Sequence, residues 1–290
     1  MIYLSHFSFP DSEEEFDFII KEKRQCYDTF YPFKVLSKHY LSMLDFELVT
    51  ILYGGNGSGK TTALNVIAEK LGLKRDTLYN RSNFFESYTD MCSYEIEEEI
   101  PKSSRIITSD DVFDFMLNLR AMNNGINRKR EELFEEYSEY LSDKYSDFKM
   151  KSLDDYEELR KLNMARSKTQ SKYVRKNLMD NVREHSNGES AFIYFTEKIQ
   201  EGGLYLLDEP ENSLSPQRQQ ELLDFLEKSA RYFDCQFIIA THSPFLLSMR
   251  NAKIYDMDED IVDVKRWTEL SNVREYYNFF KKYEKEFRSF

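Results

Sequence analysis

The segment GGNGSGKTT at 54–62 has the residue types and spacing that hold a polyphosphate. Its glycines let successive backbone N–H groups converge on phosphate oxygens, and a helix after the loop would point its positive end at them. Lys60 would bring a mobile charge to the β and γ phosphates, and the Thr61 hydroxyl would bind Mg²⁺. A chance match in a glycine turn is the alternative, which the expected flanking strand and helix disfavour. The predicted nucleotide contacts are Gly54, Asn56, Gly57, Ser58, Gly59, Lys60, Thr61 and Thr62.

Two carboxylates, Asp208 and Glu209, directly follow the apolar run LYLL at 204–207. Acids after a buried strand lie at the carboxyl edge of a parallel sheet, where the phosphate loop also lies. We expect Asp208 to hold Mg²⁺ through water, together with Thr61, and Glu209 to orient or deprotonate an attacking water. Acids after a strand are also ordinary turn residues, but the phosphate loop makes that interpretation the weaker one.

Three segments of the chain together resemble one family. GGNGSGKTT, LLDEPENSLSP and IIATHSP resemble the Walker A, Walker B with D-loop, and His-switch segments of the ABC-type ATPase superfamily, over residues 45–257. The resemblance implies an ATP-hydrolysing enzyme in which His242 contacts the γ-phosphate, and an imidazole suits this contact because it donates or accepts a proton near pH 7. On its own, a histidine at a strand end is more often structural. The catalytic residues implied are Lys60, Glu209 and His242.

The resemblance also implies a signature loop that grips the γ-phosphate of ATP bound to a second copy of the chain. HSNGESAFIYF at 185–195 is the candidate, in which Ser186 and Gly188 resemble the serine and second glycine of LSGGQ. Asn187 replaces the first glycine and Glu189 the glutamine. This spelling is similar to that of small bacterial stand-alone ATPases with an SHGES-like signature, distantly related to SMC-type ATPases. A plain helix N-cap is the alternative.

The Q-loop of this family has no glutamine at a convincing place between the phosphate loop and residue 121. Asp110, in RIITSDDVFDF, is the substitute that we consider. The same residue also suits the N-cap of the helix expected after it, so both interpretations stay open.

The rest of the chain predicts an α/β fold with a mostly parallel sheet. The N-terminal MIYLSHFSF is expected to be a strand, and apolar residues at helical spacing, closed by Gly72, predict a helix after the phosphate loop. In the last third, short strands alternate with helices, one of which has Ser215 as its N-cap and Pro216 at its first position. We expect residues 1–290 to form a single ABC-type ATPase domain with a helical insertion at 121–184.

Two segments carry apolar faces at helical spacing. The closing segment at 273–287 predicts an amphipathic helix that is either core or dimer surface. The insertion is too short and too irregular in heptads for the long coiled-coil arm of chromosome-organising relatives. Its apolar face would consist of Leu133, Tyr137, Tyr140, Leu141, Tyr145 and Phe148.

The composition indicates a folded, acidic protein, since 41% of the 290 residues are hydrophobic and the formal net charge is -12. This charge disfavours broad adhesion to nucleic acid, although a local basic patch could bind phosphates. Three separated cysteines indicate neither a disulfide framework nor a zinc site, and the apolar runs are too short to span a bilayer, so we expect a cytoplasmic protein. A basic cluster, more typical of a solvated helix face, consists of Arg166, Lys168, Lys172, Arg175, Lys176 and Arg183.

These motifs predict a Mg²⁺-dependent ATPase that closes over ATP as a homodimer and reopens after hydrolysis, without a membrane partner. Two other roles stay open: a DNA- or RNA-processing ATPase, and a subunit, for instance in phage defence, that regulates a separate effector such as a nuclease. A P-loop kinase is disfavoured, because Glu209 beside Asp208 suits water activation better than an acceptor pocket. The choice of soluble relatives over transporter subunits is an analogy.

Overall fold

The structure, a computed structural model, describes residues 1–23, 27, 29–142, 156–178 and 187–288. The chain divides into two compact units, one combining Met1–Asp114 with Asn187–Phe290 and the other comprising Phe115–Ser186. In the described part of the chain, no helix has the length and apolar character needed to cross a membrane.

The larger unit is built on a six-stranded sheet in the order β5-β6-β7-β3-β8-β9. The pairs from β5 to β8 are parallel, and β9 is antiparallel to β8. The central strands β3, β6 and β7 are buried along their whole length, as their continuous apolar sequences predict. The predicted α/β fold with a mostly parallel sheet is confirmed. The strands are β3 (Val49–Tyr53), β5 (Arg105–Thr108), β6 (Gly203–Asp208), β7 (Cys235–Thr241), β8 (Lys253–Asp256) and β9 (Asp263–Val264).

A second, antiparallel sheet has the order β2-β1-β4. The N-terminal segment forms the predicted strand, which is the central strand of this sheet. Its Phe7 is fully buried, whereas His6 and Ser8 point to the other face. The strands are β1 (Leu4–Ser8), β2 (Met43–Asp45) and β4 (Ser93–Ile96).

Helix α2 (Lys60–Lys70) follows the phosphate loop and packs against β5, β6 and β7 of the larger sheet. Its Leu64 belongs to one continuous core cluster with Phe7 of the antiparallel sheet and Leu206 of β6. Gly72 follows the helix with a φ of +62°, the left-handed conformation expected of a glycine at this end. The phosphate loop is therefore held between a buried strand and a helix that lies in the core.

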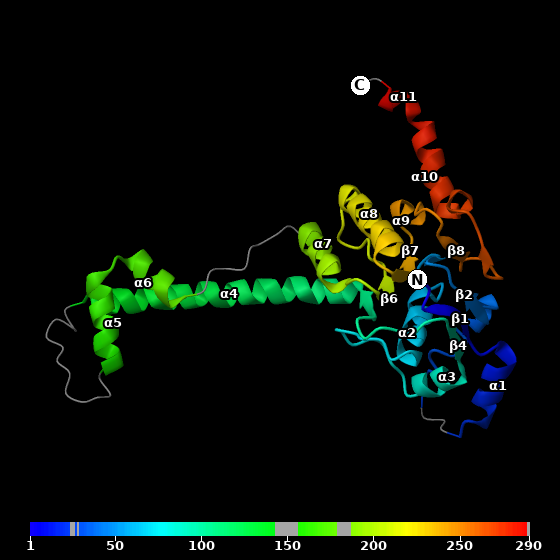
Figure 1. The fold of residues 1–290 in the computed structure, drawn as a ribbon, viewed down its shortest axis with the longest axis horizontal. Helices are drawn as coiled ribbons and strands as arrows, with labels where there is room; N and C mark the ends of the chain where they lie inside the picture. Colours follow the sequence, from blue (N-terminus) through cyan, green and yellow to red (C-terminus); the bar gives the residue numbers. More distant parts are fainter. Residues whose placement is uncertain (24–26, 28, 143–155, 179–186, 289–290) are drawn as a thin grey trace. The chain divides into compact units, whose positions relative to one another are not determined.

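Helix α8 (Pro216–Tyr232) packs against β7 on the face of the sheet opposite to α2 (Figure 1). It begins as predicted, with Pro216 at its first position and the Ser215 side chain accepting a hydrogen bond from the backbone. Leu222 and Leu226 are fully buried on its inner side. The other helices of the larger unit are α1 (Ser12–Lys21), α3 (Phe85–Met91), α7 (Asn187–Lys198), α9 (Pro244–Leu247), α10 (Ser271–Lys282) and α11 (Glu284–Phe287).

The smaller unit has its own apolar cluster, to which α5 (Tyr156–Ser167) and α6 (Gln170–Asn177) contribute. Helix α4 (Ser109–Tyr140) runs from the larger unit into it, and its Leu133 and Tyr140 are buried in the cluster, as predicted. The prediction for Leu141 is wrong: this side chain is 50% exposed because the helix ends one residue earlier. Predicted positions that lie outside the described residues include Cys26, Tyr145, Phe148, Arg183 and Ser186.

Helix α10 has one buried side chain, Val273, among its described residues. Its aromatic residues are about half exposed, including Tyr276 (50%) and Phe280 (52%). The prediction that the closing helix is core is therefore wrong, because the larger unit covers only the beginning of this helix. Its alternative assignment to a dimer surface stays a prediction.

Candidate functional site

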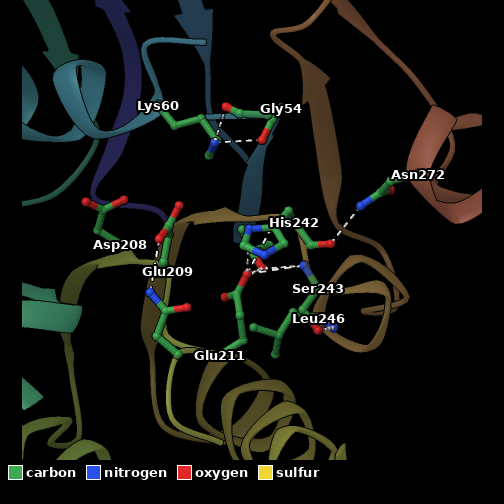
Figure 2. A network of polar contacts seen from close by, with 12 residues as sticks. Gly54, Lys60, Asp208, Glu209, Glu211, His242, Ser243, Leu246 and Asn272 are labelled. Atoms are coloured by element: carbon green, nitrogen blue, oxygen red, sulfur yellow. Dashed lines mark hydrogen bonds and ion pairs between the residues drawn. The ribbon is translucent and has the colours of Figure 1, made fainter. Parts of the chain in front are cut away.

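The phosphate loop leaves β3 at the carboxyl edge of the parallel sheet (Figure 2). Gly59 precedes α2 with a φ of +91°, and a Cβ atom there would meet Leu36 Cδ2 at 3.0 Å, so the position requires glycine. Lys60 is buried, and its Nζ donates hydrogen bonds to Gly54 O (2.6 Å) and Gly55 O (2.9 Å). The ammonium group is thus held against the loop, beside the backbone N–H groups that could bind phosphate.

Asp208, the last residue of β6, accepts a hydrogen bond from Thr61 Oγ1 at its Oδ1 (3.1 Å). The structure therefore brings the two predicted Mg²⁺ ligands together. The pKa of Asp208 is raised to about 6, chiefly by burial, while the bond from Thr61 lowers it and the charge of Glu209 raises it. A hard divalent cation held by Thr61 and Asp208 would add positive charge beside this buried carboxylate, so the pair fits Mg²⁺.

Glu209 has a φ of +48°, a left-handed conformation that is uncommon for a residue with a side chain. Its N–H donates to Ala240 O on β7 (2.9 Å), and its Oε2 accepts from Asn212 Nδ2 (3.0 Å). The side chain lines a cavity of about 290 Å³ beside the phosphate loop. A strained backbone that directs a carboxylate into a cavity is typical of a functional residue.

Tyr31 and Val35 also line this cavity, and neither belongs to a recognisable sequence motif. Tyr31 Oη is 3.2 Å from Thr62 Oγ1, so the aromatic side chain lies against the start of α2. Because the two segments are 31 residues apart, the contact has no local sequence signal. The complete lining is Tyr31, Val35, Asn56, Gly57, Gly59, Lys60, Thr61, Thr62 and Glu209.

Glu211 ties the turn after β6 to the loop that carries His242 (Figure 2). This buried carboxylate accepts hydrogen bonds at Oε1 from Thr241 Oγ1 (2.7 Å), His242 N (2.9 Å) and Ser243 N (3.2 Å). The His242 side chain is 48% exposed, with Nδ1 3.4 Å from the same oxygen. Sequence reasoning missed Glu211, although a third acid inside DEPEN was an available signal. Its effect is to fix the backbone at His242.

Asp258 is a second residue that the sequence did not indicate. It follows β8, which lies beside β3, and its Oδ1 accepts a hydrogen bond from Gly55 N–H at 2.7 Å. An acid two residues beyond a strand has no distinctive pattern, so only the strand order reveals the contact. The peptide group between Gly54 and Gly55 is therefore bound at its N–H by Asp258 and at its C=O by Lys60.

The family model described as ABC transporter matches residues 43–212, more than half of the chain. The chain belongs to the ABC-type ATPase superfamily. It is an ATP-hydrolysing P-loop enzyme, as the resemblance predicted. A second model, for an AAA domain of the AbiEii toxin kind in type IV toxin–antitoxin systems, matches 195–248. No curated protein matches the ATPase.

The ATPase is also similar, at low identity, to several solved structures. The Smc head domain from Pyrococcus furiosus, bound to the C-terminal domain of ScpA, is 14% identical, with 83% of this chain and 95% of that chain covered and a TM-score of 0.40. The SMC head domain from Thermotoga maritima is 15% identical, with 78% of this chain and 92% of that chain covered and a TM-score of 0.35. A dimeric ATP-binding cassette bound to ADP and phosphate is 14% identical, with 79% of this chain and 90% of that chain covered and a TM-score of 0.36.

The signature candidate of the ATPase lies at the start of α7, where Ser186 falls outside the described residues. Gly188 packs closely on the segment before α8, since a Cβ atom there would be 3.3 Å from Ser213 O. Glu189 Oε1 is 3.5 Å from Arg218 Nη2. As far as the structure describes this region, Gly188 and Glu189 do not line the cavity beside their own phosphate loop.

Asp110 of the ATPase is not the N-cap of α4, contrary to one of the two interpretations above. Thr108 N–H donates to Asp111 Oδ2 (2.6 Å) and Asp111 N–H to Thr108 Oγ1 (3.4 Å), which is a capping box. In a capping box, the side chain three positions after the cap accepts from the N–H of the cap. Asp110 is only two positions after Thr108, and it is exposed. Thr108 pairs with Asp208 across the sheet, so Asp111 is the buried acid at this strand end.

Proposed function

We propose that two copies of this ATPase close over ATP and Mg²⁺, and that hydrolysis reopens them. The observation that carries the proposal is the one-sided cavity: the phosphate loop and Glu209 line it, whereas Gly188 and Glu189 of the same chain contact the start of α8. The signature residues of a second copy, including Ser186, would close the open side and contact the γ-phosphate.

In the proposed site, the loop amides and Lys60 bind the phosphates, and Thr61 and Asp208 hold Mg²⁺, which supplies positive charge to the phosphate oxygens when bound. Glu209 takes a proton from the attacking water, and His242 contacts the γ-phosphate. Release of the γ-phosphate removes the group that bridges the two copies, so the dimer opens. Such a switch needs a partner that responds to the open or closed state of the dimer, and we assign that role to a separate effector protein.

A nucleotide-dependent change in mass tests the dimer. The chain of 34.8 kDa is expected to double in mass with ATP and Mg²⁺ under conditions of slow turnover, and to stay monomeric with ADP. Size-exclusion chromatography with light scattering measures both states. A chain that hydrolyses ATP yet stays monomeric at every protein concentration would contradict the homodimer and leave the ATPase assignment in place.

We also place the ATPase in the cytoplasm, as one domain over 1–290 with its insertion at 121–184. Cys92 and Cys235 are buried free thiols, and burial raises the pKa of Cys92 to about 12 and that of Cys235 to about 11. Protonated, inaccessible thiols of this kind are compatible with a reducing compartment and unsuited to a disulfide framework.

Replacing Tyr31 with alanine is expected to weaken ATP binding about 10-fold, because an aromatic contact with a base contributes roughly 1–3 kcal/mol. The ring lines the cavity next to Thr62, where the nucleoside would extend beyond the phosphates. Tyr31→Phe keeps the ring and is expected to bind ATP almost as the wild type does. Calorimetric titration with ATP and with inorganic triphosphate measures the difference. Equal losses for both ligands would show that the ring does not contact the base.

A further inference from the structure

The first turn of α10 is attached to the end of β3 by one hydroxyl group. Tyr53 is buried, and its Oη lies 3.0 Å from Ser271 Oγ and accepts a hydrogen bond from Asn272 N–H (3.3 Å). The residue before the helix, Leu270, provides no side-chain cap. Because the first N–H groups of a helix need outside acceptors, the Tyr53 hydroxyl takes the place of the missing cap.

Asn272 attaches the same turn to the His242 loop (Figure 2). Its Nδ2 donates to His242 O at 2.9 Å, while its Oδ1 is buried without a hydrogen-bond partner among the described residues. An unpaired buried oxygen is unfavourable. The amide nevertheless has this orientation, and the bond from Nδ2 to His242 O is the interaction that favours it. Since Glu211 accepts from His242 N–H, the backbone of His242 is held at its N–H by one carboxylate and at its C=O by α10.

The rest of α10 has little contact with the larger unit. Leu270 is fully buried and Val273 is 7% exposed, and they anchor the first turn. Further along, Tyr276 and Tyr277 are 50% and 54% exposed. A helix fixed only at its first turn passes any displacement of its free part directly to Asn272 and from there to the His242 loop.

We propose that Asn272 is a positioning residue that sets the place of His242 through the docked first turn of α10, so that α10 controls the rate of hydrolysis. This inference rests on the proposed contact between His242 and the γ-phosphate. The phosphate loop binds most of the triphosphate without His242. Loss of the Asn272 bond therefore acts on turnover and leaves ATP affinity nearly unchanged.

Asn272→Asp tests the proposal, because it keeps the size of the side chain and removes the N–H donor. We expect kcat to fall about 10-fold and the KM for ATP to stay within about 2-fold, as for the loss of one hydrogen bond that acts in the transition state. Asn278→Asp makes the same change at an exposed position of α10 and is expected to leave both constants unaltered. Equal kcat values for the two variants would overturn the proposal.

A double-mutant cycle with His242→Ala separates positioning from general damage. If Asn272 acts through His242, Asn272→Asp produces no further loss in the His242→Ala background, whereas an independent effect would multiply and contradict the proposal. Tyr53→Phe, which removes only the hydroxyl, provides a second variant if Asn272→Asp fails to fold. Wild-type turnover in His242→Ala would refute the role of His242 itself, while a silent Asn272→Asp beside an impaired His242→Ala refutes the positioning role alone.

Discussion

Replacing Glu209 with glutamine is expected to slow ATP hydrolysis by about 100- to 10,000-fold and to leave ATP binding intact. The carboxylate lines the cavity beside the phosphate loop, at a backbone whose φ of +48° and N–H bond to Ala240 O fix its direction. Glutamine has the same shape, and its amide oxygen can accept the bond that Asn212 donates to Glu209 Oε2. The substitution therefore removes the base and retains the structure around it.

This variant should also accumulate as an ATP-bound dimer, since the bridging γ-phosphate is no longer removed. Phosphate release measures turnover, and light scattering with ATP and Mg²⁺ measures mass. Glu227→Gln is the matched control: its Oε1 accepts from Arg250 N–H at 2.9 Å, and it does not line the cavity of the phosphate loop. Turnover of Glu209→Gln at the level of Glu227→Gln would exclude Glu209 as the base.

The parts of the site that could be predicted are those encoded by continuous segments. A phosphate loop needs glycines, a lysine and a hydroxyl in a fixed order, and parallel strands that end in acids bring Asp208 to the same sheet edge. The 3.1 Å bond between Thr61 and Asp208 shows that this reasoning placed the two side chains correctly. The buried central strands followed from their apolar sequences for the same reason, because each pattern is complete within a few residues.

The residues that could not be predicted make contacts between segments that follow neighbouring strands of the sheet and are far apart in the sequence. Asp258 reaches Gly55 because β8 lies beside β3, and Glu211 reaches His242 because β6 lies beside β7. Hydrophobic patterns identify strands and do not order them, so neither pair has a signal in the sequence. The N-cap interpretation of Asp110 failed for a different reason: the helix begins two residues earlier, so Thr108 is the cap and Asp110 lies in the first turn.

Lys60→Ala is expected to weaken ATP binding by at least about 100-fold, since two charge-assisted hydrogen bonds of roughly 1.5–3 kcal/mol each would be lost. Hydrogen bonds to Gly54 O and Gly55 O hold the ammonium group against the loop. Little conformational freedom remains to be lost on binding, so most of the attraction to the β and γ phosphates contributes to affinity. Turnover should fall further, since the same charge stabilises the transition state.

Lys70→Ala, at the last residue of α2, distinguishes this effect from a general loss of positive charge. Lys70 Nζ donates to Thr89 O at 2.8 Å, so its removal changes the net charge equally, at the end of the helix away from the phosphates. Calorimetric titration should give an affinity for ATP near the wild-type value with Lys70→Ala and no measurable binding at micromolar ATP with Lys60→Ala. If the two variants bound ATP equally well, the loop amides alone would hold the triphosphate and the charge of Lys60 would be dispensable for binding.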